Sequence, residues 1–156
     1  MSTKRVVVLA AVVLCAAGMV MGQTEWVDDP SNPIIGPGEP GTWEATGHWV
    51  RAAVFDGTTY HLWFTGSDAS GMPTDMGHAT STDGVTWNMD AANPVLTRSE
   101  PGEWDDSRLD GAAVVHDGTT FHMWYSAWGP DDFERVGYAT STDGTVWTKH
   151  PDNPVM

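Results

Sequence analysis

The stretch MGHATSTDGVTW (residues 76–87) returns sixty residues later as VGYATSTDGTVW (residues 136–147), with eight of its twelve positions identical. A fixed period of about 60 residues indicates one supersecondary unit used more than once, each copy burying its apolar faces against its neighbours. Three further elements recur in the same order: Asn-Pro-Ile-Ile from Asn32 returns from Asn93 and Asn153 with related apolar residues, Gly-Thr-Trp-Glu from Gly41 returns as Gly-Glu-Trp-Asp from Gly102, and VFDGTTYHLWFTG from Val54 returns as VHDGTTFHMWYSA from Val115. The chain therefore contains the end of one unit, marked by Trp26, and two whole units.

Each unit is predicted to be a meander of short antiparallel strands, because turn signals follow one another about every ten residues. In the first unit, Asp56-Gly57 and Asp83-Gly84 are two-residue hairpin signals. They delimit expected strands over residues 49–55, 59–65 and 76–81, and a fourth strand through Trp87. No long segment has apolar residues at helical spacing, which predicts an all-β chain.

The second strand of the unit distinguishes two all-β folds. Along Tyr60 to Thr65, alternate positions put Tyr, Leu and Phe on one face and His, Trp and Thr on the other. A β-sandwich built by duplication would show cleaner alternation of apolar and polar residues. Bulky groups on both faces favour a β-propeller blade, which lies stacked between neighbouring blades. We therefore expect two four-stranded blades, over about residues 42–90 and 103–150, and an additional outer strand over Trp26 to Asp28.

Residues 1–22 are predicted to be a secretory signal peptide. A basic start at Lys4 and Arg5 precedes an apolar run over residues 6–21, and small residues occupy positions 20 and 22. This pattern predicts cleavage before residue 23, and a partial propeller over residues 23–156 that is secreted or periplasmic. A membrane anchor is the alternative, but the run of about 16 residues is shorter than the roughly 20 that span a bilayer. A lipid anchor on Cys15 is disfavoured by the bulky Leu14 before it.

The charge and the single cysteine exclude several classes of function. The chain has 7 basic and 21 acidic residues and a formal net charge of −14. Such a surface repels nucleic acids, and no membrane partner is expected after cleavage. Cys15 lies in the signal segment, so the mature chain has no thiolate chemistry and no disulfide. No cluster has metal-ligand spacing and no phosphate-binding glycine loop occurs, so no metal or cofactor is expected. The dispersed acidity suits a solvated exterior or a site for neutral, hydroxyl-rich ligands.

The order of the repeated elements resembles that of five-bladed propeller glycosidases. These elements are an apolar strand, Asp-Gly, Tyr-x-Leu-Trp-Phe, Gly-His-Ala-Thr-Ser-x-Asp-Gly-x-x-Trp and Asn-Pro-Val-Leu. The resembled proteins are the arabinanase, levansucrase and invertase superfamily, which includes glycoside hydrolase families 43 and 32. The resemblance covers nearly all of Trp26 to Met156 and implies carbohydrate processing with arabinan- or fructan-like substrates. Residues 81–87 also resemble the sialidase Asp-box without the residue between Asp and Gly, and in both settings Asp83 and Asp143 are expected to build a hairpin.

In the resembled enzymes, the two carboxyl groups that hydrolysis needs lie on different blades, at the axial start of the first strands. Blade one has His-Trp-Val-Arg at this place (residues 48–51) and no carboxylate, whereas blade two has Arg-Leu-Asp-Gly (residues 108–111). Asp110 is therefore the candidate catalytic residue, either as a base or as the aspartate that orients the acid. Alternatively, Asp110 caps a loop or pairs with Arg108. Three acids upstream are interpreted as solvated loop charges: Glu44, Asp105 and Asp106.

Trp49, Trp128 and Arg108 are the candidate substrate-binding residues. Trp49 takes the position that corresponds to Asp110, and Trp128 lies at the loop end of a second strand. Aromatic rings at these places would stack on sugars, and the alternative for both is packing between blades. His61 recurs as His122 at a mid-strand position, which indicates packing or a backbone hydrogen bond.

Two hypotheses for the function follow. The first is an exported, glycoside-hydrolase-like propeller protein. The second is a non-catalytic module that binds sugar or protein, because blade one lacks the acid. Two blades fall short of a five-bladed ring, so the chain is expected to be a fragment of a longer gene or one of several copies that complete a ring. Asp110 alone supplies half of what hydrolysis requires, so we expect no turnover by this chain. Its open blade faces are expected to drive self-association.

Overall fold

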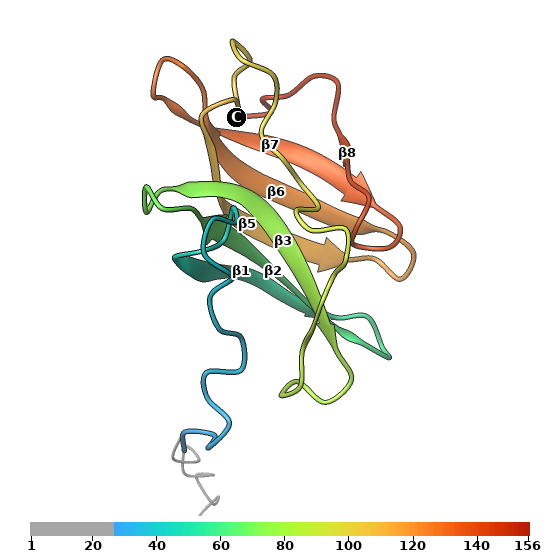
Figure 1. The fold of residues 1–156 in the computed structure, drawn as a ribbon. Coiled ribbons are helices and arrows are strands. Elements are labelled where there is room, and N and C mark those ends of the chain that lie inside the picture. Colours follow the sequence, from blue (N-terminus) through green and yellow to red (C-terminus); the bar gives the residue numbers. More distant parts are fainter. Residues whose placement is uncertain (1–26) are drawn as a thin grey trace, which may run out of the picture. The chain divides into compact units, whose positions relative to one another are not determined.

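The computed structural model describes residues 27–156, and these form two four-stranded antiparallel sheets (Figure 1). The strands of blade one are β1 (Gly47–Phe55), β2 (Tyr60–Ser67), β3 (Pro73–Ser81) and β4 (Asn88–Met89). The strands of blade two are β5 (Arg108–His116), β6 (Phe121–Trp128), β7 (Glu134–Ser141) and β8 (Thr148–Lys149). Each sheet follows the chain order, and the described residues contain no helix. The predicted all-β fold with two four-stranded units is confirmed.

The two Asp-Gly-Thr-Thr turns close the first hairpin of each blade in the same way. Asp56 Oδ1 accepts hydrogen bonds from the backbone N–H groups of Thr58 and Thr59, both at 2.8 Å. These donors hold the pKa of Asp56 well below its usual range. Gly57 has a φ of 109°, a conformation that favours glycine. Asp117 makes the equivalent bonds in blade two, so these aspartates build turns.

The Ser-Thr-Asp-Gly-x-x-Trp element is a second hairpin turn. Ser81 Oγ accepts from the Gly84 N–H at 2.8 Å, and Asp83 Oδ1 accepts from the backbone N–H groups of Val85 and Thr86 at 2.8 and 2.7 Å. The backbone hydrogen bonds lower the pKa of Asp83 to about 2. Trp87 is not a strand residue, because its indole N–H donates to the Gly84 carbonyl at 3.1 Å and closes the turn. The fourth strand is Asn88–Met89, which lies after the residues through Trp87 where it was expected.

The Asn-Pro-Val-Leu element continues the outer edge of each blade. The side-chain amide of Asn93 pairs with the backbone of His78, accepting from its N–H at 2.7 Å and donating to its carbonyl at 2.9 Å. Leu96 then forms an antiparallel bridge with Met76 on β3. Asn153 makes the same pair of bonds in blade two. The element therefore extends the short fourth strand.

The two blades pack against each other through one apolar core. Its buried members come from both blades: Trp63, Met76, Leu96, Leu109, Phe121, Met123, Tyr125, Ala127 and Ala139. The indole N–H of Trp63, which is fully buried, donates to the Gly144 carbonyl of blade two at 3.0 Å. A smaller cluster of Leu62, Phe64 and Ala79 lies on the other face of blade one. Burial on both faces of β2 agrees with a blade.

Two expectations concern the N-terminal part of the chain. The predicted signal peptide over residues 1–22 and Trp26 lie outside the described residues. Val27 and Asp28 are described and are not part of a strand, so the outer strand expected there is not found at these two residues. Within residues 27–156, no helix is long and apolar enough to cross a membrane.

Candidate functional site

The first strands of the two blades meet at an ion pair between Arg51 and Asp110. Arg51 on β1 reaches across the blade interface to the Asp110 carboxylate on β5. Thr65 on β2 connects the two, since its hydroxyl donates to the Asp110 carbonyl at 2.9 Å and accepts from Arg51 Nε at 3.2 Å. Both charged side chains are partly exposed. Asp110 thus faces a neighbouring blade and solvent at the start of its strand.

Irregularities in both strands aim these side chains at each other. The pairing register of β1 with β2 shifts between Val50 and Ala52, at Arg51. The register of β5 with β6 shifts between Leu109 and Ala112, at Asp110 and the following glycine. A bulge re-aims a side chain out of the regular alternation of a strand. The expected alternative of an Asp110–Arg108 pair is therefore not found, because the bulge turns Asp110 toward Arg51.

Arg108 and Trp128 form a second pair at the same end of blade two. The Arg108 guanidinium lies 4.2 Å from the centroid of the Trp128 ring, a cation–π contact. Asp132 Oδ1 lies 3.6 Å from Arg108 Nη2, and the Asp132 side chain is almost fully exposed. The loop after Trp128 passes close to the backbone of Trp104. Gly129 permits this approach, because a Cβ there would lie 2.7 Å from the Trp104 carbonyl oxygen. The structure thus brings together two of the predicted substrate-binding residues.

Trp49, the third predicted binding residue, lies two positions before Arg51 on β1. Its side chain is 39% exposed, and the Arg51 guanidinium lies 5.7 Å from the ring centroid. Trp49 is therefore available to a ligand, whereas the buried Trp63 packs between the blades. The four candidate site residues lie on β1, β5 and β6; β5 contacts each of the other two strands, and it begins near the Arg51–Asp110 pair.

The three upstream acids differ from the expectation that all are solvated loop charges. Asp105 is fully buried, and its carboxylate accepts from the Lys149 ammonium at 2.6 Å and the Tyr125 hydroxyl at 3.3 Å. Burial, and then the nearby Asp105 charge, raise the pKa of Tyr125 above its usual range. Glu44 is half-buried and lies 2.8 Å from His48 Nε2. Only Asp106 keeps a loop role, accepting a backbone hydrogen bond from Gly102. The expectation is thus wrong for Asp105, because a lysine on β8 pairs with it.

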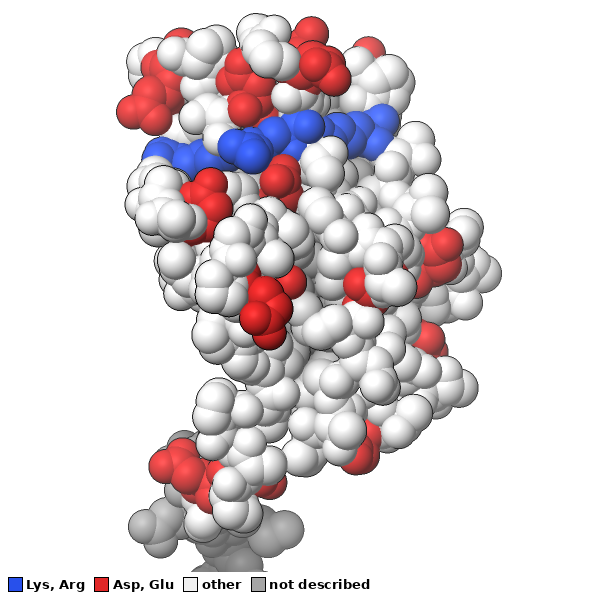
Figure 2. Space-filling view, in the orientation of Figure 1, with Lys and Arg blue, Asp and Glu red and all other residues white. Residues whose placement is uncertain are grey.

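All basic side chains of the described residues are paired with aspartates. The five pairs are Arg51–Asp110, Arg98–Asp75, Arg108–Asp132, Arg135–Asp131 and Lys149–Asp105. Figure 2 shows basic side chains gathered in one narrow band, with acidic side chains on either side of it. Because the acidic residues of the chain outnumber the basic ones by 21 to 7, the surface is unsuited to anionic ligands.

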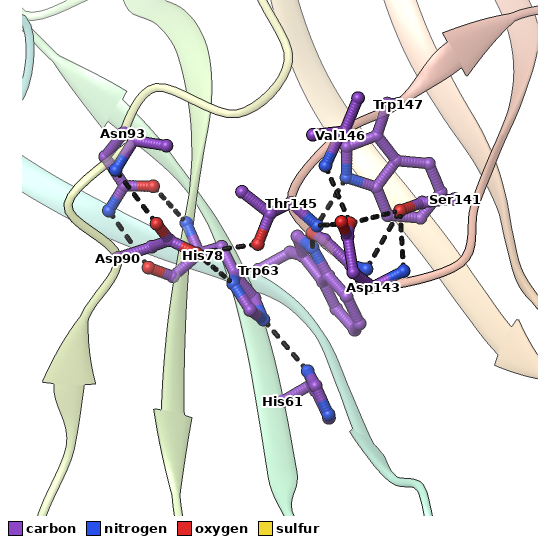
Figure 3. A network of polar contacts seen from close by, with 12 residues as sticks. His61, Trp63, His78, Asp90, Asn93, Ser141, Asp143, Thr145, Val146 and Trp147 are labelled. Carbon is purple, nitrogen blue, oxygen red and sulfur yellow. Dashed lines mark hydrogen bonds and ion pairs between the residues drawn. The ribbon is translucent and has the colours of Figure 1, made fainter.

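A polar network crosses from blade one to blade two beside Trp63 (Figure 3). His61 Nδ1 lies 3.0 Å from His78 Nε2, and His78 Nδ1 lies 3.1 Å from Asp90 Oδ2. The Thr145 hydroxyl of blade two donates to the same Asp90 oxygen at 2.7 Å. Burial, more than any other cause, lowers the pKa of His78. The network connects the two blades through the Thr145–Asp90 hydrogen bond. No local sequence pattern predicts it, because its members lie far apart in the chain.

The two repeated histidines pack as expected but bond to side chains rather than to the backbone. His61 Nε2 lies 3.1 Å from Asp56 Oδ2, and His122 Nε2 lies at the same distance from Asp117 Oδ2. His122 Nδ1 lies 2.6 Å from the Tyr138 hydroxyl, where blade one has a second histidine. Within residues 27–156, no group of three or more histidine, cysteine or acidic side chains is placed to hold a metal ion.

An apolar cavity of the described residues lies away from the Arg51–Asp110 pair. It has a volume of about 510 Å³ and lies on the face of blade one that is turned away from blade two. Its lining consists of Asn32, Pro33, Ile34, Ile35, His48, Val50, Leu62 and Phe64. The cavity is almost purely apolar, so it lacks the convergent polar groups that orient a sugar.

The sequence of the chain is similar to that of two curated proteins. No protein-family model matches the chain. Two uncharacterized proteins of Mycobacterium tuberculosis, Rv1502 and MT1551, are each 33% identical to it over 132 residues. The match covers 79% of this chain and 43% of each relative, so the chain spans less than half the length of the curated relatives it matches.

Solved structures share the fold at low sequence identity. A solved glycoside hydrolase has a TM-score of 0.59 and 23% identity, over 74% of this chain and 42% of its own length. Zg3597, a family 117 glycoside hydrolase of Zobellia galactanivorans, has a TM-score of 0.56 and 15% identity, over 72% and 40%. The Bombyx mori family 32 β-fructofuranosidase has a TM-score of 0.53 and 20% identity, over 69% and 23%. The match to part of each structure agrees with two blades of a larger ring, and residues 31–156 therefore have the fold of consecutive blades of a propeller glycoside hydrolase.

Proposed function

We propose that the protein is an exported, carbohydrate-binding propeller of the glycoside hydrolase type, and that sugars bind at the Arg51–Asp110 pair. The observation that carries this proposal is the ion pair itself, which joins the first strands of two blades and stays partly exposed. A carboxylate and a guanidinium side by side offer acceptors and donors that match the hydroxyl groups of a sugar. The glycoside hydrolase fold supports the same ligand class.

Aromatic side chains lie near this ion pair on β1 and at the end of β6, next to the start of β5. Trp49 is 39% exposed beside Arg51 on β1, and Trp128 lies under Arg108 at the end of β6. Sugar rings have apolar faces that stack on such side chains, while a polar pair between the aromatics fixes orientation. We assign Trp49 and Trp128 to stacking, Arg108 to positioning Trp128, and Asp110 to accepting hydrogen bonds from sugar hydroxyls.

Hydrolysis needs a second carboxyl group opposite the first. Glu44 is bound to His48, and Asp105 is buried against Lys149, so neither is free to act on a substrate beside Asp110. In an active propeller of this type, Asp110 would then orient the acid and a further blade would supply the partner. Binding without turnover is the activity that these two blades support.

Binding can be measured by isothermal titration of the full chain with arabino- and fructo-oligosaccharides. We expect Asp110→Asn to weaken binding about tenfold or more, because a hydrogen bond to a charged group contributes about 1.5–3 kcal/mol. Trp128→Ala should weaken it as well. Trp124→Ala is the matched control, since Trp124 is also exposed, at 42%, and lies in the middle of β6, four residues before Trp128. Equal losses in Trp124→Ala and Trp128→Ala, or no binding to any sugar, would contradict the proposal.

Turnover is tested on aryl-glycosides and arabinan with the same protein. We expect no product above that of a buffer control. General acid or base help from one group is worth only about 10² to 10⁴ in rate. Hydrolysis that disappears in Asp110→Asn would show that a second carboxylate acts nearby, and Glu44→Gln and Asp132→Asn would then identify it. Export is tested by expression with a secretion reporter and N-terminal sequencing, which should find Gln23 as the first residue.

A further inference from the structure

The contact between the two blades provides a template for a second contact. Within the chain, Trp63 of blade one inserts into blade two, where its ring centroid lies 5.4 Å from Phe121 and 5.9 Å from Trp147. Its indole N–H donates to the Gly144 carbonyl. A Cβ at Gly144 would lie 3.0 Å from the Trp63 ring, so the glycine allows this close approach. One tryptophan and one glycine turn thus define how blades dock.

Blade two carries the same docking residue on a face that nothing covers in the described part of the chain. Trp124 is the repeat equivalent of Trp63, yet it is 42% exposed, against 0% for Trp63. Its neighbours on the sheet are Ala113 on one side and Tyr138 on the other. Val115 on the same side of β5 is also exposed. We call this side of blade two, with residues 113, 115, 122, 124 and 138, the open face.

Blade one carries the matching receptor. The apolar cavity of about 510 Å³ is lined by His48, Leu62 and Phe64 among others. Their repeat equivalents in blade two are Leu109, Met123 and Tyr125, which are all fully buried in the core that encloses Trp63. The cavity is therefore the unfilled counterpart of the site that Trp63 occupies.

The glycine turn of blade one is also vacant. Gly84 corresponds to Gly144, and a Cβ at Gly84 would meet no atom within 4 Å. The Gly84 carbonyl accepts one hydrogen bond from Trp87, just as the Gly144 carbonyl accepts one from Trp147. The Gly144 carbonyl takes its second bond from Trp63. A carbonyl has two lone pairs, so the Gly84 carbonyl can accept a second indole in the same way.

We propose that the open face of one copy docks into the blade-one cavity of a second copy, so that copies associate head to tail as the blades do within one chain. Trp124 fills the cavity, and its indole N–H donates to the Gly84 carbonyl of the second copy. The contact is heterologous, which means that it continues from copy to copy until a ring closes. The two blades of residues 31–156 are the unit that each copy contributes to this contact.

Charge opposes this association and provides a way to recognise it. Each copy has a formal net charge of −14. Trp124 and most of the cavity lining are apolar, so salt should screen the repulsion between copies without weakening the contact. We expect sedimentation velocity on the full chain to show a mass that rises with protein concentration, and rises further between about 0.05 and 0.5 M NaCl.

Two variants and their mixture test the direction of the contact. Trp124→Glu removes the docking residue, and Val50→Glu places a charge in the cavity at a residue that is 60% exposed, so neither disturbs a buried position. Each variant alone should remain monomeric at concentrations where the wild type associates. Their mixture should form a one-to-one dimer, because one variant keeps an intact cavity and the other keeps Trp124. Phe133→Glu adds the same charge at another exposed aromatic residue and should associate like the wild type.

Several outcomes would overturn the proposal. A wild-type chain that stays monomeric up to about millimolar concentration would show that a second copy does not cover the open face. Association of the Trp124→Glu or Val50→Glu variant at wild-type strength would place the contact elsewhere. A mixture that stays monomeric would exclude head-to-tail docking, since a symmetric contact is broken in both variants. Sugar binding does not enter these measurements, so their failure would leave the proposed function untouched.

Discussion

Strands β2 and β6 are repeats of one sequence, yet they differ in what surrounds them. Seven of the eight residues of β2 are buried, on both faces of the strand. Along β6, buried residues alternate with partly or fully exposed ones. Blade two and the segment around Trp43 cover the two faces of β2, whereas the described residues cover only one face of β6. The sequence of a blade therefore specifies two faces to bury, and the neighbouring blade decides whether both are buried.

This difference shows which features of a blade depend on its own sequence and which depend on the neighbouring blade. The hairpin turns are the same in both blades, because their hydrogen bonds lie within a few residues. The environment of the repeated tryptophan differs completely, since its acceptor lies 81 residues away on the next blade. The hydrogen bonds of each turn are thus determined by the blade's own sequence. The stability of a blade depends also on the blades packed against it.

The largest expected effect on stability comes from replacing the repeated tryptophan in each blade. Trp63→Ala should lower the free energy of unfolding by about 3–5 kcal/mol, since it empties a fully buried site between the blades. Trp124→Ala should lower it by about 1 kcal/mol or less, because a half-exposed side chain loses little burial. Urea denaturation of both variants, at a protein concentration where the chain is monomeric, measures the difference.

The control for these two variants is to measure how their loss of stability depends on protein concentration. At higher concentration, the cost of Trp124→Ala should rise toward that of Trp63→Ala if docking between copies buries the ring. Equal costs in dilute solution would mean that Trp124 is already buried and that the two blades do not differ in the way described above.

The second effect concerns the acids at equivalent positions before the first strand. Lys149→Met should cost about 2–3 kcal/mol, because it leaves the buried Asp105 carboxylate without its cation. This is below the usual cost of breaking a buried pair, since Lys149 is partly exposed. Glu44→Gln in blade one should cost about 1 kcal/mol or less, as the amide keeps a hydrogen bond to His48. Thermal and urea unfolding distinguish the two, and a change below about 0.5 kcal/mol in Lys149→Met would refute a buried pair.

The smallest effect is a pH dependence that arises at His78 in blade one. Burial lowers the pKa of His78 below its ordinary 6.5, so protonation favours the unfolded chain. This contribution is fully present above pH 6.5 and is lost as the pH falls below it. Blade two has Tyr138 at the equivalent position. His78→Gln should flatten the fall in stability between about pH 6.5 and 5. Identical slopes in the wild type and His78→Gln would remove His78 as the cause.

Much of the fold could be predicted because it is encoded locally and twice. The Asp-Gly turns mark where β1 and β5 end, and bulky groups on both sides of Tyr60 to Thr65 indicate stacking between blades. The partner of a side chain in another blade is not encoded locally. The Asp110 cation proved to be Arg51, 59 positions earlier, because a bulge turns the carboxylate away from its neighbour Arg108. The burial of Asp105 depends on Lys149, for which blade one has Met89, so the repeat offered no hint of it.

Solvent contact of the two repeated tryptophans tests the central comparison most directly. With 5-fluorotryptophan in the chain, fluorine NMR resonances of residues 63 and 124 can be assigned from Trp63→Phe and Trp124→Phe variants. In dilute protein, the exchange of H₂O for D₂O should shift the Trp124 resonance and leave the Trp63 resonance unchanged. At high concentration the Trp124 shift should shrink as a second copy covers the ring. A Trp63 resonance that shifts as much as that of Trp124 in dilute protein would contradict the packing of blade two over blade one.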